Sequence, residues 1–210
     1  MSLRHPSRTT TPLRLYGRRV MMRPLAANDF REWSEVRRRN HDWLTVWEPS
    51  RQPQHADPVA DRGAFTSRCL QRDRDRASGT AYQFGLFLDQ HVAGEVNINN
   101  VVRGAMQSAT IGYWIDQAHA GQGFVAEAVV VVLQFAFEQL GLHRIEICIV
   151  PRNERSRRIV DKLGIRDEGI ALRYLEINGV WEDHVRYGIT VEEWNDRRGE
   201  LMGTWVDTVQ

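Results

Sequence analysis

The chain has almost no lysine, only two cysteines and no long apolar run. Lys162 is the single lysine among its 28 basic residues, and the cysteines are Cys69 and Cys148. These cysteines have neither metal-ligand nor CxxC spacing, so we expect no metal site and no disulfide framework. The apolar run Ala128–Leu133 is far shorter than the ~20 residues of a membrane-spanning helix. Composition therefore argues against membrane, metal-binding and disulfide-rich classes.

Positive and negative charges are nearly balanced. Lys and Arg total 28 and Asp and Glu total 27, giving a formal net charge of +1. We therefore expect no dominant nucleic-acid-binding surface. Residues 1–12 contain arginine but no acid, and we interpret them as a flexible basic segment, with a contact to RNA or an acidic partner as the alternative. No apolar signal segment is readable there, so a cytoplasmic protein is expected.

A length of 210 residues with 42% hydrophobic content fits one globular domain. We expect this domain to occupy residues 13–199, followed by a C-terminal tail over residues 200–210. Residue patterns predict a mixed α+β fold. The expected elements are a strand over 19–25, a helix capped by Asn28 or Asp29, a loop over 43–57, a helix from Asp57-Pro58 to near Gly79, a hairpin of 82–88 with 91–99, and a hairpin around Asn178-Gly179.

The most informative segment is glycine-rich and reads Gly121-Gln122-Gly123-Phe124-Val125-Ala126. It lies between a β-patterned run at 109–116 and a helical run at 127–140. Glycines there let backbone N–H groups converge, and a helix N-terminus adds positive charge, which suits a phosphate or pyrophosphate. No lysine follows, which excludes a P-loop. The dinucleotide-binding pattern G-x-G-x-x-A fits literally, but it requires an acid at the end of the next strand to bind the ribose, and Glu146 falls inside its strand. A simple tight turn before a helix remains the alternative.

The residues that follow distinguish between these interpretations. A strand at 144–150 is followed by Pro151-Arg152-Asn153-Glu154-Arg155-Ser156, which opens a short helix. This order resembles the GNAT superfamily of acetyl-CoA-dependent N-acetyltransferases, and within it the ribosomal-protein-alanine N-acetyltransferases of the RimJ and RimL type. The likeness runs from about residue 13 to 194. Its further supporting segments are 40–44, 47–49, 99–104, 112–115 and 178–185.

The resemblance implies a fold, a cosubstrate and its binding residues. The fold is α+β in three layers, with a mixed, mostly antiparallel twisted sheet flanked by helices, and the cosubstrate is acetyl-CoA, without a metal. The first and last positions of the family's glycine pattern are altered here, to Ala120 and Val125, and a side-chain contact is lost at position 120. The implied cofactor residues are the loop amides of Gly121, Gln122, Gly123, Phe124, Val125 and Ala126, the strand end Trp114, Ile115 and Asp116, and the side chain of Asn153.

Catalytic and acceptor residues follow from the same resemblance. Ser156 aligns with a serine near the departing sulfur, and as the alternative it is an ordinary first-turn residue. Glu95 could take the amine proton through water, or else face solvent from its strand. Asn153 could bind the pantetheine arm, cap its helix, or do both. Trp43, Trp47 and Tyr113 could line the acceptor site, although aromatic residues more often fill a core.

The expected reaction is acetylation of the α-amine of a protein, with a ribosomal protein beginning with alanine or serine as the expected acceptor. An α-amine with pKa near ~8 is roughly one-tenth neutral at pH 7, whereas lysine is almost fully protonated. Two alternatives stay open: acetylation of a small amine such as an antibiotic or polyamine, and a non-catalytic CoA-binding module. A monomer or homodimer is expected, without membrane contact. No direct contact with nucleic acid is expected, and a contact through the basic N-terminal arm stays as the alternative.

Overall fold

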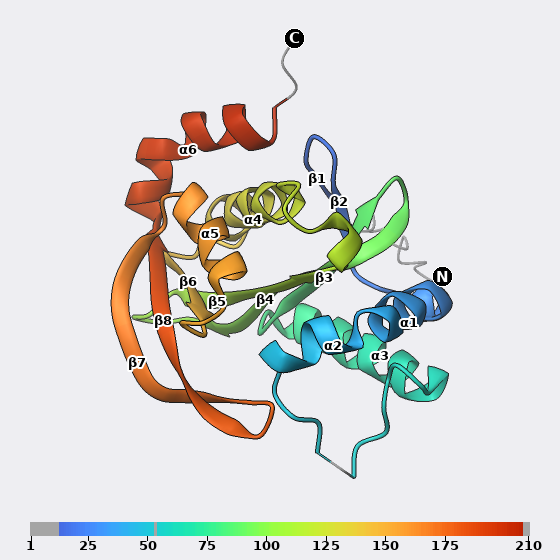
Figure 1. Cartoon of the computed structure of the whole chain (residues 1–210). Helices are drawn as coiled ribbons and strands as arrows, with labels where there is room; N and C mark the ends of the chain where they lie inside the picture. The colour runs from blue at the N-terminus through green and yellow to red at the C-terminus, as the bar shows by residue number, and fades with distance from the viewer. Residues whose placement is uncertain (1–12, 53, 208–210) are drawn as a thin grey trace, which may run out of the picture.

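The computed structural model describes residues 13–52 and 54–207, so the predicted basic segment 1–12 lies outside the described residues. Its centre is an eight-stranded sheet in the order β1-β2-β3-β4-β5-β6-β8-β7. All neighbouring strands are antiparallel except β5 and β6, which are parallel. Helices α1 to α3 lie on one side of the sheet and α4 to α6 on the other (Figure 1). The predicted three-layer α+β fold is confirmed.

The bounds of the elements follow. The strands are β1 (Leu15–Tyr16), β2 (Met21–Arg23), β3 (Tyr82–Leu88), β4 (His91–Val102), β5 (Ser108–Ile115), β6 (Arg144–Ile149), β7 (Arg166–Ile177) and β8 (Val180–Thr190). The α-helices are α1 (Phe30–Arg39), α2 (His41–Leu44), α3 (Arg62–Ser78), α4 (Phe124–Gln134), α5 (Glu154–Lys162) and α6 (Val191–Trp205). Short turns of helix are η1 (Ala27–Asp29), η2 (Thr45–Trp47), η3 (Gln117–His119) and η4 (Phe135–Gln139), the last with π geometry.

Both predicted hairpins are present. Asp89 and Gln90, between β3 and β4, have φ of 47° and 71°, and Asn178 and Gly179, between β7 and β8, have φ of 47° and 82°. Two consecutive left-handed residues are what a two-residue hairpin turn of the type I′ class requires. The valine run in α4 is helical despite its β propensity, because the packing of an amphipathic or buried helix overrides local preference.

Three predicted boundaries differ from the structure. The second long helix begins at Arg62 rather than at Asp57-Pro58, because Asp61 is its N-cap and accepts a bond from the Ala64 amide. The predicted loop over 43–57 contains helical turns, since α2 and η2 occupy its first part. The predicted boundary at residue 199 falls inside α6, which continues to Trp205 with Leu201 and Met202 buried.

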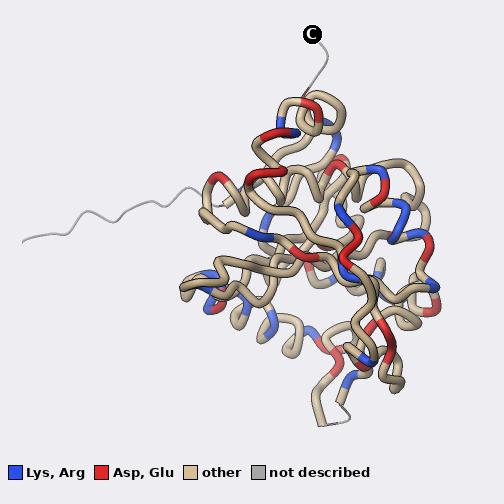
Figure 2. Tube along the Cα trace, turned by 90° about the vertical axis from the view of Figure 1, so that its left-hand side faces the viewer, with Lys and Arg blue, Asp and Glu red and all other residues tan. Residues whose placement is uncertain are grey.

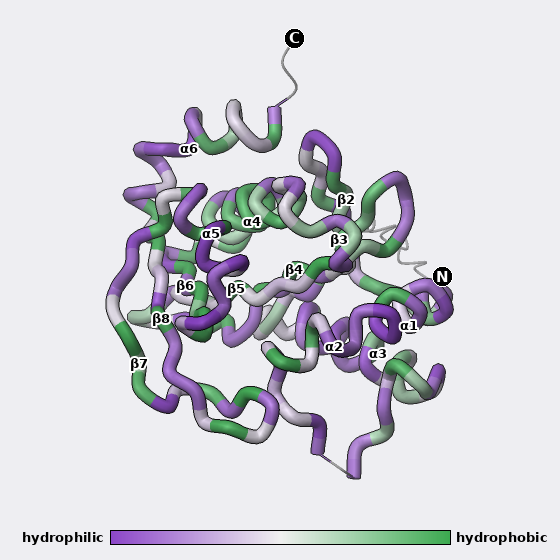
Figure 3. Tube along the Cα trace, in the orientation of Figure 1, coloured by the Kyte–Doolittle hydropathy of each residue, from purple (hydrophilic) through white to green (hydrophobic). Residues whose placement is uncertain are grey.

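Apolar side chains are concentrated between the sheet and α4. Every residue of α4 from Val125 to Leu133 is buried, and this helix is coloured mostly as hydrophobic in Figure 3. A second, smaller cluster joins α1 and α3 to the other face through Trp33, Phe65 and Phe87. Basic and acidic residues alternate along the trace in Figure 2 instead of forming one large patch. Within the described ranges, no helix is both long and apolar enough to cross a membrane.

Candidate active site

The sheet divides between its two parallel strands. β5 and β6 pair over three residues only, from Ser108–Arg144 to Thr110–Glu146. Beyond this point β5 continues to Ile115 in pairing with β4, and β6 continues to Ile149 in pairing with β8. The β6-facing edge of residues 111–115 is therefore free of strand pairing in the described structure. An extended ligand can add to such an edge through main-chain hydrogen bonds.

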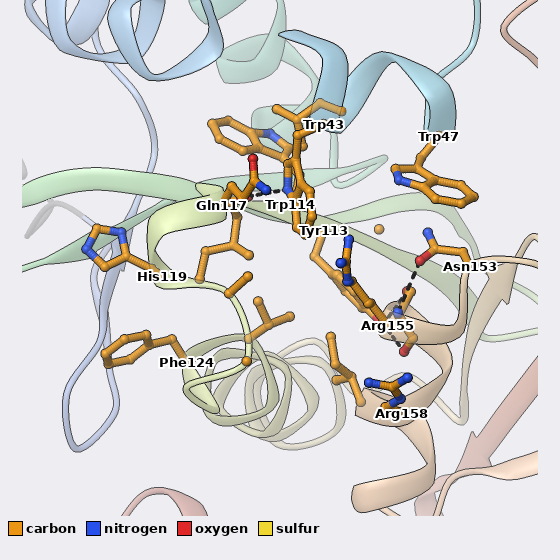
Figure 4. Close-up of a pocket in the computed structure, with 18 of the residues that line it drawn as sticks. Trp43, Trp47, Tyr113, Trp114, Gln117, His119, Phe124, Asn153, Arg155 and Arg158 are labelled. Carbon is orange, nitrogen blue, oxygen red and sulfur yellow. Dashed lines mark hydrogen bonds between the residues drawn. The ribbon is translucent and has the colours of Figure 1, made fainter. Parts of the chain in front are cut away.

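A pocket of about 800 Å³ lies at this division (Figure 4). One wall comes from α2 and η2, the floor from β5, another wall from α5, and the end from the N-terminus of α4. Twelve of the fifteen site residues expected from the sequence line it. They are Trp43, Trp47, Tyr113, Trp114, Ile115, Gly121, Gly123, Phe124, Val125, Ala126, Asn153 and Ser156.

The glycine loop presents the start of α4 to the pocket. Gly121 and Gly123 have φ of 78° and 86°, a conformation that glycine adopts at no steric cost. Gly123 is the N-cap of α4, and no side chain caps that end. The first N–H groups of the helix and its positive dipole end are thus available to an anion. Gln122 does not line the pocket, because its side chain turns back to the Ala118 carbonyl at 3.1 Å.

Asp116 is also outside the pocket, contrary to its expected cofactor contact. Its main-chain N–H donates to the Ala93 carbonyl at 2.7 Å, and its side chain is only 2% exposed. The carboxylate accepts hydrogen bonds from Arg39, Asn40 and the Ala118 amide. Burial alone would raise the pKa of Asp116, but these hydrogen bonds outweigh it and lower the pKa. Asp116 is therefore an ionised structural group at the end of β5.

Ser156 and Tyr113 form a hydroxyl pair on the pocket wall. Ser156 Oγ donates to the Tyr113 hydroxyl at 3.0 Å, and that hydroxyl lies 3.3 Å from the Ser156 carbonyl. Burial raises the pKa of Tyr113, which keeps its hydroxyl protonated. Asn153 is the N-cap of α5, and its Oδ1 accepts from the Ser156 amide at 3.2 Å. Asn153 thus caps the helix while also lining the pocket.

The structure corrects the prediction that Glu95 is the general base. Its side chain is fully buried on the face of the sheet covered by α1 and α3. It accepts from Trp33 Nε1 at 2.7 Å and pairs with Arg68 and Arg72 at 2.8 Å each. Burial would raise the pKa of Glu95, but the two guanidinium groups outweigh it and lower the pKa. A carboxylate held in this way neither reaches the pocket nor binds a proton readily.

The acceptor wall carries the two tryptophans predicted there. Arg155 lies over the Trp43 ring at 4.6 Å, and Arg152 lies over the Trp47 ring at 4.7 Å. In Figure 4, Trp43 and Trp47 project from one side and Arg155 and Arg158 from the other. The Nε1 of Trp43 also donates to the Ile115 carbonyl at 3.2 Å. These rings are therefore part of the pocket rather than of the core.

Several lining residues were missed by sequence reasoning. Arg155, Arg158 and Lys162 project from α5 at intervals of three and four residues, which places them along one side of that helix. This helical spacing of basic residues just after Asn153 was a readable signal. Together with the free strand edge and the start of α4, this basic row fits an extended arm that ends in phosphates. Across the described part of the chain, no group of three or more His, Cys, Asp or Glu is placed to hold a metal.

Comparison with known proteins agrees with this geometry. The profile of the acetyltransferase (GNAT) domain matches residues 19–166. The chain is 37% identical to the probable N-acetyltransferase YjcK of Bacillus subtilis, covering 81% of this chain and 93% of YjcK. It is 31% identical to the [ribosomal protein uS5]-alanine N-acetyltransferase of Escherichia coli, covering 89% and 95%. It also superposes on Mycobacterium smegmatis RimJ in complex with CoA-disulfide, with TM-score 0.82, 31% identity, and 96% and 97% coverage.

Proposed function

The chain belongs to the GNAT acetyltransferase family, and from this premise we propose that it acetylates the α-amine of a protein that begins with a short residue such as alanine or serine. A ribosomal protein is the proposed acceptor. The Escherichia coli relative, named for the alanine of ribosomal protein uS5, matches nearly over its whole length and supports this choice. Acetyl-CoA is the proposed acetyl donor, in keeping with the CoA-disulfide held by Mycobacterium smegmatis RimJ.

The donor would be held by three parts of the pocket. The start of α4 after Gly123 offers N–H groups to a pyrophosphate. The free edge of β5 near Ile115 offers main-chain groups to the extended arm, and the basic row on α5 offers charge to a further phosphate. When bound, acetyl-CoA supplies an acyl group activated as a thioester. The Ser156 hydroxyl, which donates to Tyr113 in this structure, would turn its proton toward a departing sulfur.

The charge of the pocket lining is the observation that favours an α-amine over a polyamine as the acceptor. Among the lining residues of the described chain, Glu48 is the only carboxylate. Both its oxygens accept from Arg37 at 2.6 Å, so its charge is already paired. A polyamine carries several ammonium groups and requires several free carboxylates. This lining instead suits an amine that enters uncharged, as a tenth of α-amines do near pH 7.

With Glu95 held outside the pocket, the proposed reaction uses the neutral fraction of the amine. The α-amine has a pKa near ~8, so water can take up its proton before or during transfer. We therefore expect kcat/KM to rise with pH in parallel with the fraction of neutral acceptor amine. A peptide acceptor with a lower α-amine pKa should shift this profile to lower pH by the same amount.

The test compares acceptors of one sequence. A peptide beginning with alanine or serine is assayed beside the same peptide with a blocked terminus and a free internal lysine, and beside spermidine. The free α-amine should give the highest kcat/KM, because a lysine pays a protonation cost of about three pK units at neutral pH. Preference for the blocked lysine peptide or for spermidine would refute the α-amine assignment. Absence of transfer to all three, with intact CoA binding, would support a non-catalytic CoA-binding module.

A further inference from the structure

We propose that Asn40 and Asp116 are positioning residues that hold the acceptor wall in register with the donor strand. Neither residue lines the pocket. Asn40 lies between α1 and α2, just before Trp43 on the acceptor wall, and Asp116 follows the last residue of β5. The proposal rests on the proposed acetyl transfer, and it adds a coupling between the two halves of the site.

The two segments are joined by several polar contacts. Asn40 Nδ2 donates to Asp116 Oδ1 at 2.9 Å, and Asn40 Oδ1 accepts from the Gln117 amide at 2.9 Å. Arg39 Nε donates to Asp116 Oδ2 at 3.1 Å. The Trp43 indole extends the same junction with its bond to the Ile115 carbonyl. Segment 39–43 is thereby fastened to segment 115–117 across the edge of the pocket.

Asn40 is fixed in both directions. Its Nδ2 also donates to the Val36 carbonyl at 2.8 Å in the last turn of α1, and the residue is only 2% exposed. On the other side, Asp116 accepts from the Ala118 amide at 3.2 Å and so shapes the turn that leads into the glycine loop. A shift of α1 is therefore transmitted to η3, the turn that precedes the glycine loop. The junction thus contacts the acceptor wall and the donor strand β5, and it contacts neither the acceptor nor the donor itself.

The polar character of this junction is what suggests a positional role. Apolar side chains could join α1 to the end of β5, but their attraction is not directional. Hydrogen bonds with an ionised carboxylate fix both distance and direction, at the cost of burying polar groups. Asp116 is ionised, and its carboxylate accepts from Arg39 and Asn40 on the first segment and from the Ala118 amide just beyond the second. Such an arrangement sets orientation more than it adds stability.

Loss of the junction should affect transfer more than donor binding. The acceptor amine must meet the acyl carbon in a near-attack geometry, and a misplacement of ~1 Å can cost ~10²-fold in rate. The start of α4 and the basic row on α5 stay in place, because no contact of Asn40 reaches them. We expect Asn40→Ala to lower kcat about 10- to 100-fold while the calorimetric Kd for CoA changes less than about threefold.

A reciprocal exchange separates positioning from simple destabilisation. Asn40→Asp alone brings a carboxylate against Asp116 and should be the most damaging single change. Adding Asp116→Asn returns a donor opposite the new carboxylate, while the Val36 carbonyl stays without its donor. The double variant should therefore regain at least tenfold in kcat over Asn40→Asp and remain below the wild type. Ser34→Ala is the matched control, because Ser34 is equally buried on α1 but bonds to the Val59 carbonyl, away from β5. It should lower thermal stability without changing the ratio of kcat to CoA affinity.

The kinetic constants of all variants are measured with the acceptor that the wild type acetylates best among the Ala- or Ser-terminal peptide, the blocked lysine peptide and spermidine. Amide hydrogen exchange of residues 41–47 and 115–118 gives a readout that needs no acceptor. Asn40→Ala should raise exchange in both segments together, and Ser34→Ala in neither. Unchanged kcat, absent rescue by the exchange, or independent exchange of the segments would overturn the positioning role. If the wild type acetylates none of these acceptors but Asn40→Ala raises hydrogen exchange in both segments together, the proposed function is rejected and the structural coupling of the two segments stands.

Discussion

Glu95→Gln provides the sharpest test of how the buried carboxylate acts. In the structure this side chain is fully buried between Trp33, Arg68 and Arg72. Glutamine has nearly the same shape and can still accept from the Trp33 indole. It removes the negative charge, however, and leaves two guanidinium groups facing a neutral amide. We expect a large loss of stability and little change in the chemistry of transfer.

The size of the loss follows from the burial of the three groups. Removing one partner of a buried ion pair costs roughly 3–5 kcal/mol. Arg68 and Arg72 keep 24% and 16% of their side-chain exposure, so water can offset part of the loss. We therefore expect about 3 kcal/mol in the free energy of unfolding. For a chain of this size, that corresponds to a fall of about 6–12 °C in Tm.

The pH dependence of this stability has a defined sign. Arginine pairing lowers the pKa of Glu95 in the folded state, against an unfolded value near ~4.3. The stabilisation is thus complete above the unfolded pKa and is lost as pH falls toward the folded pKa. Denaturant unfolding of wild type and Glu95→Gln should show a constant difference from pH 6 to 8. That difference should narrow below about pH 4.

Kinetics of the folded variant complete the assay. Below its Tm, Glu95→Gln should keep the wild-type shape of the kcat/KM profile between pH 6 and 9, and a kcat within a few-fold. The combination of Glu95→Gln with Arg68→Met and Arg72→Met is the matched variant, because it removes all three charges together while the glutamine still accepts from Trp33 Nε1. Replacing a whole buried ion cluster in this way is often neutral or stabilising. Wild-type stability in Glu95→Gln together with a large loss of kcat and a shifted pH profile would refute this reasoning and restore Glu95 as the base.

Three further outcomes are expected. Ser156→Ala and Tyr113→Phe should each lower kcat by about tenfold or less with CoA affinity intact, since a thiol pKa near ~8.5 already makes the thiolate a tolerable leaving group; equal loss of CoA affinity in calorimetry would assign the pair to binding instead. Gly121→Ala and Gly123→Ala should both weaken CoA binding and lower Tm, because both glycines have a left-handed φ that strains any side chain. Gly123→Ala should lower Tm more, because its new Cβ would also lie 3.3 Å from Trp205 whereas that of Gly121 meets open space; the opposite order in Tm would contradict this. Glu168→Gln should lower the free energy of unfolding at pH 7 but not near pH 2. The hydrogen bond from Arg144 lowers the pKa of Glu168 to about 2, and the stabilisation by the carboxylate is lost as pH falls through that value. A pH-independent difference in unfolding free energy between wild type and variant would exclude the ion pair as the source of the effect.

Features encoded in short stretches of sequence were predicted well. The Asn178-Gly179 turn formed because two residues with left-handed backbone fit the twist of a hairpin, and this preference is local. The glycine loop lies between a strand and a helix, as predicted, and twelve expected residues line one pocket. Asp57-Pro58 misplaced the start of α3 because Asp61, four residues later, supplies the side-chain cap that the helix uses. Two aspartates four residues apart, each able to cap a helix, cannot be ranked from propensity alone.

The sequence by itself determined the fold class and the place of the glycine loop between a strand and a helix, because hydrophobic periodicity, turn residues and glycine spacing act over a few residues. The family followed from the resemblance of several separate motifs. Tertiary structure alone decided the roles of the acids. Glu95 became a structural ion because α3 brings Arg68, 27 residues earlier in the chain, beneath its strand. Asp116 became part of a junction because Asn40, 76 residues earlier, meets it at the end of β5. A carboxylate's proton affinity depends on burial and on the charges around it, and distant segments supply both only after the chain has packed.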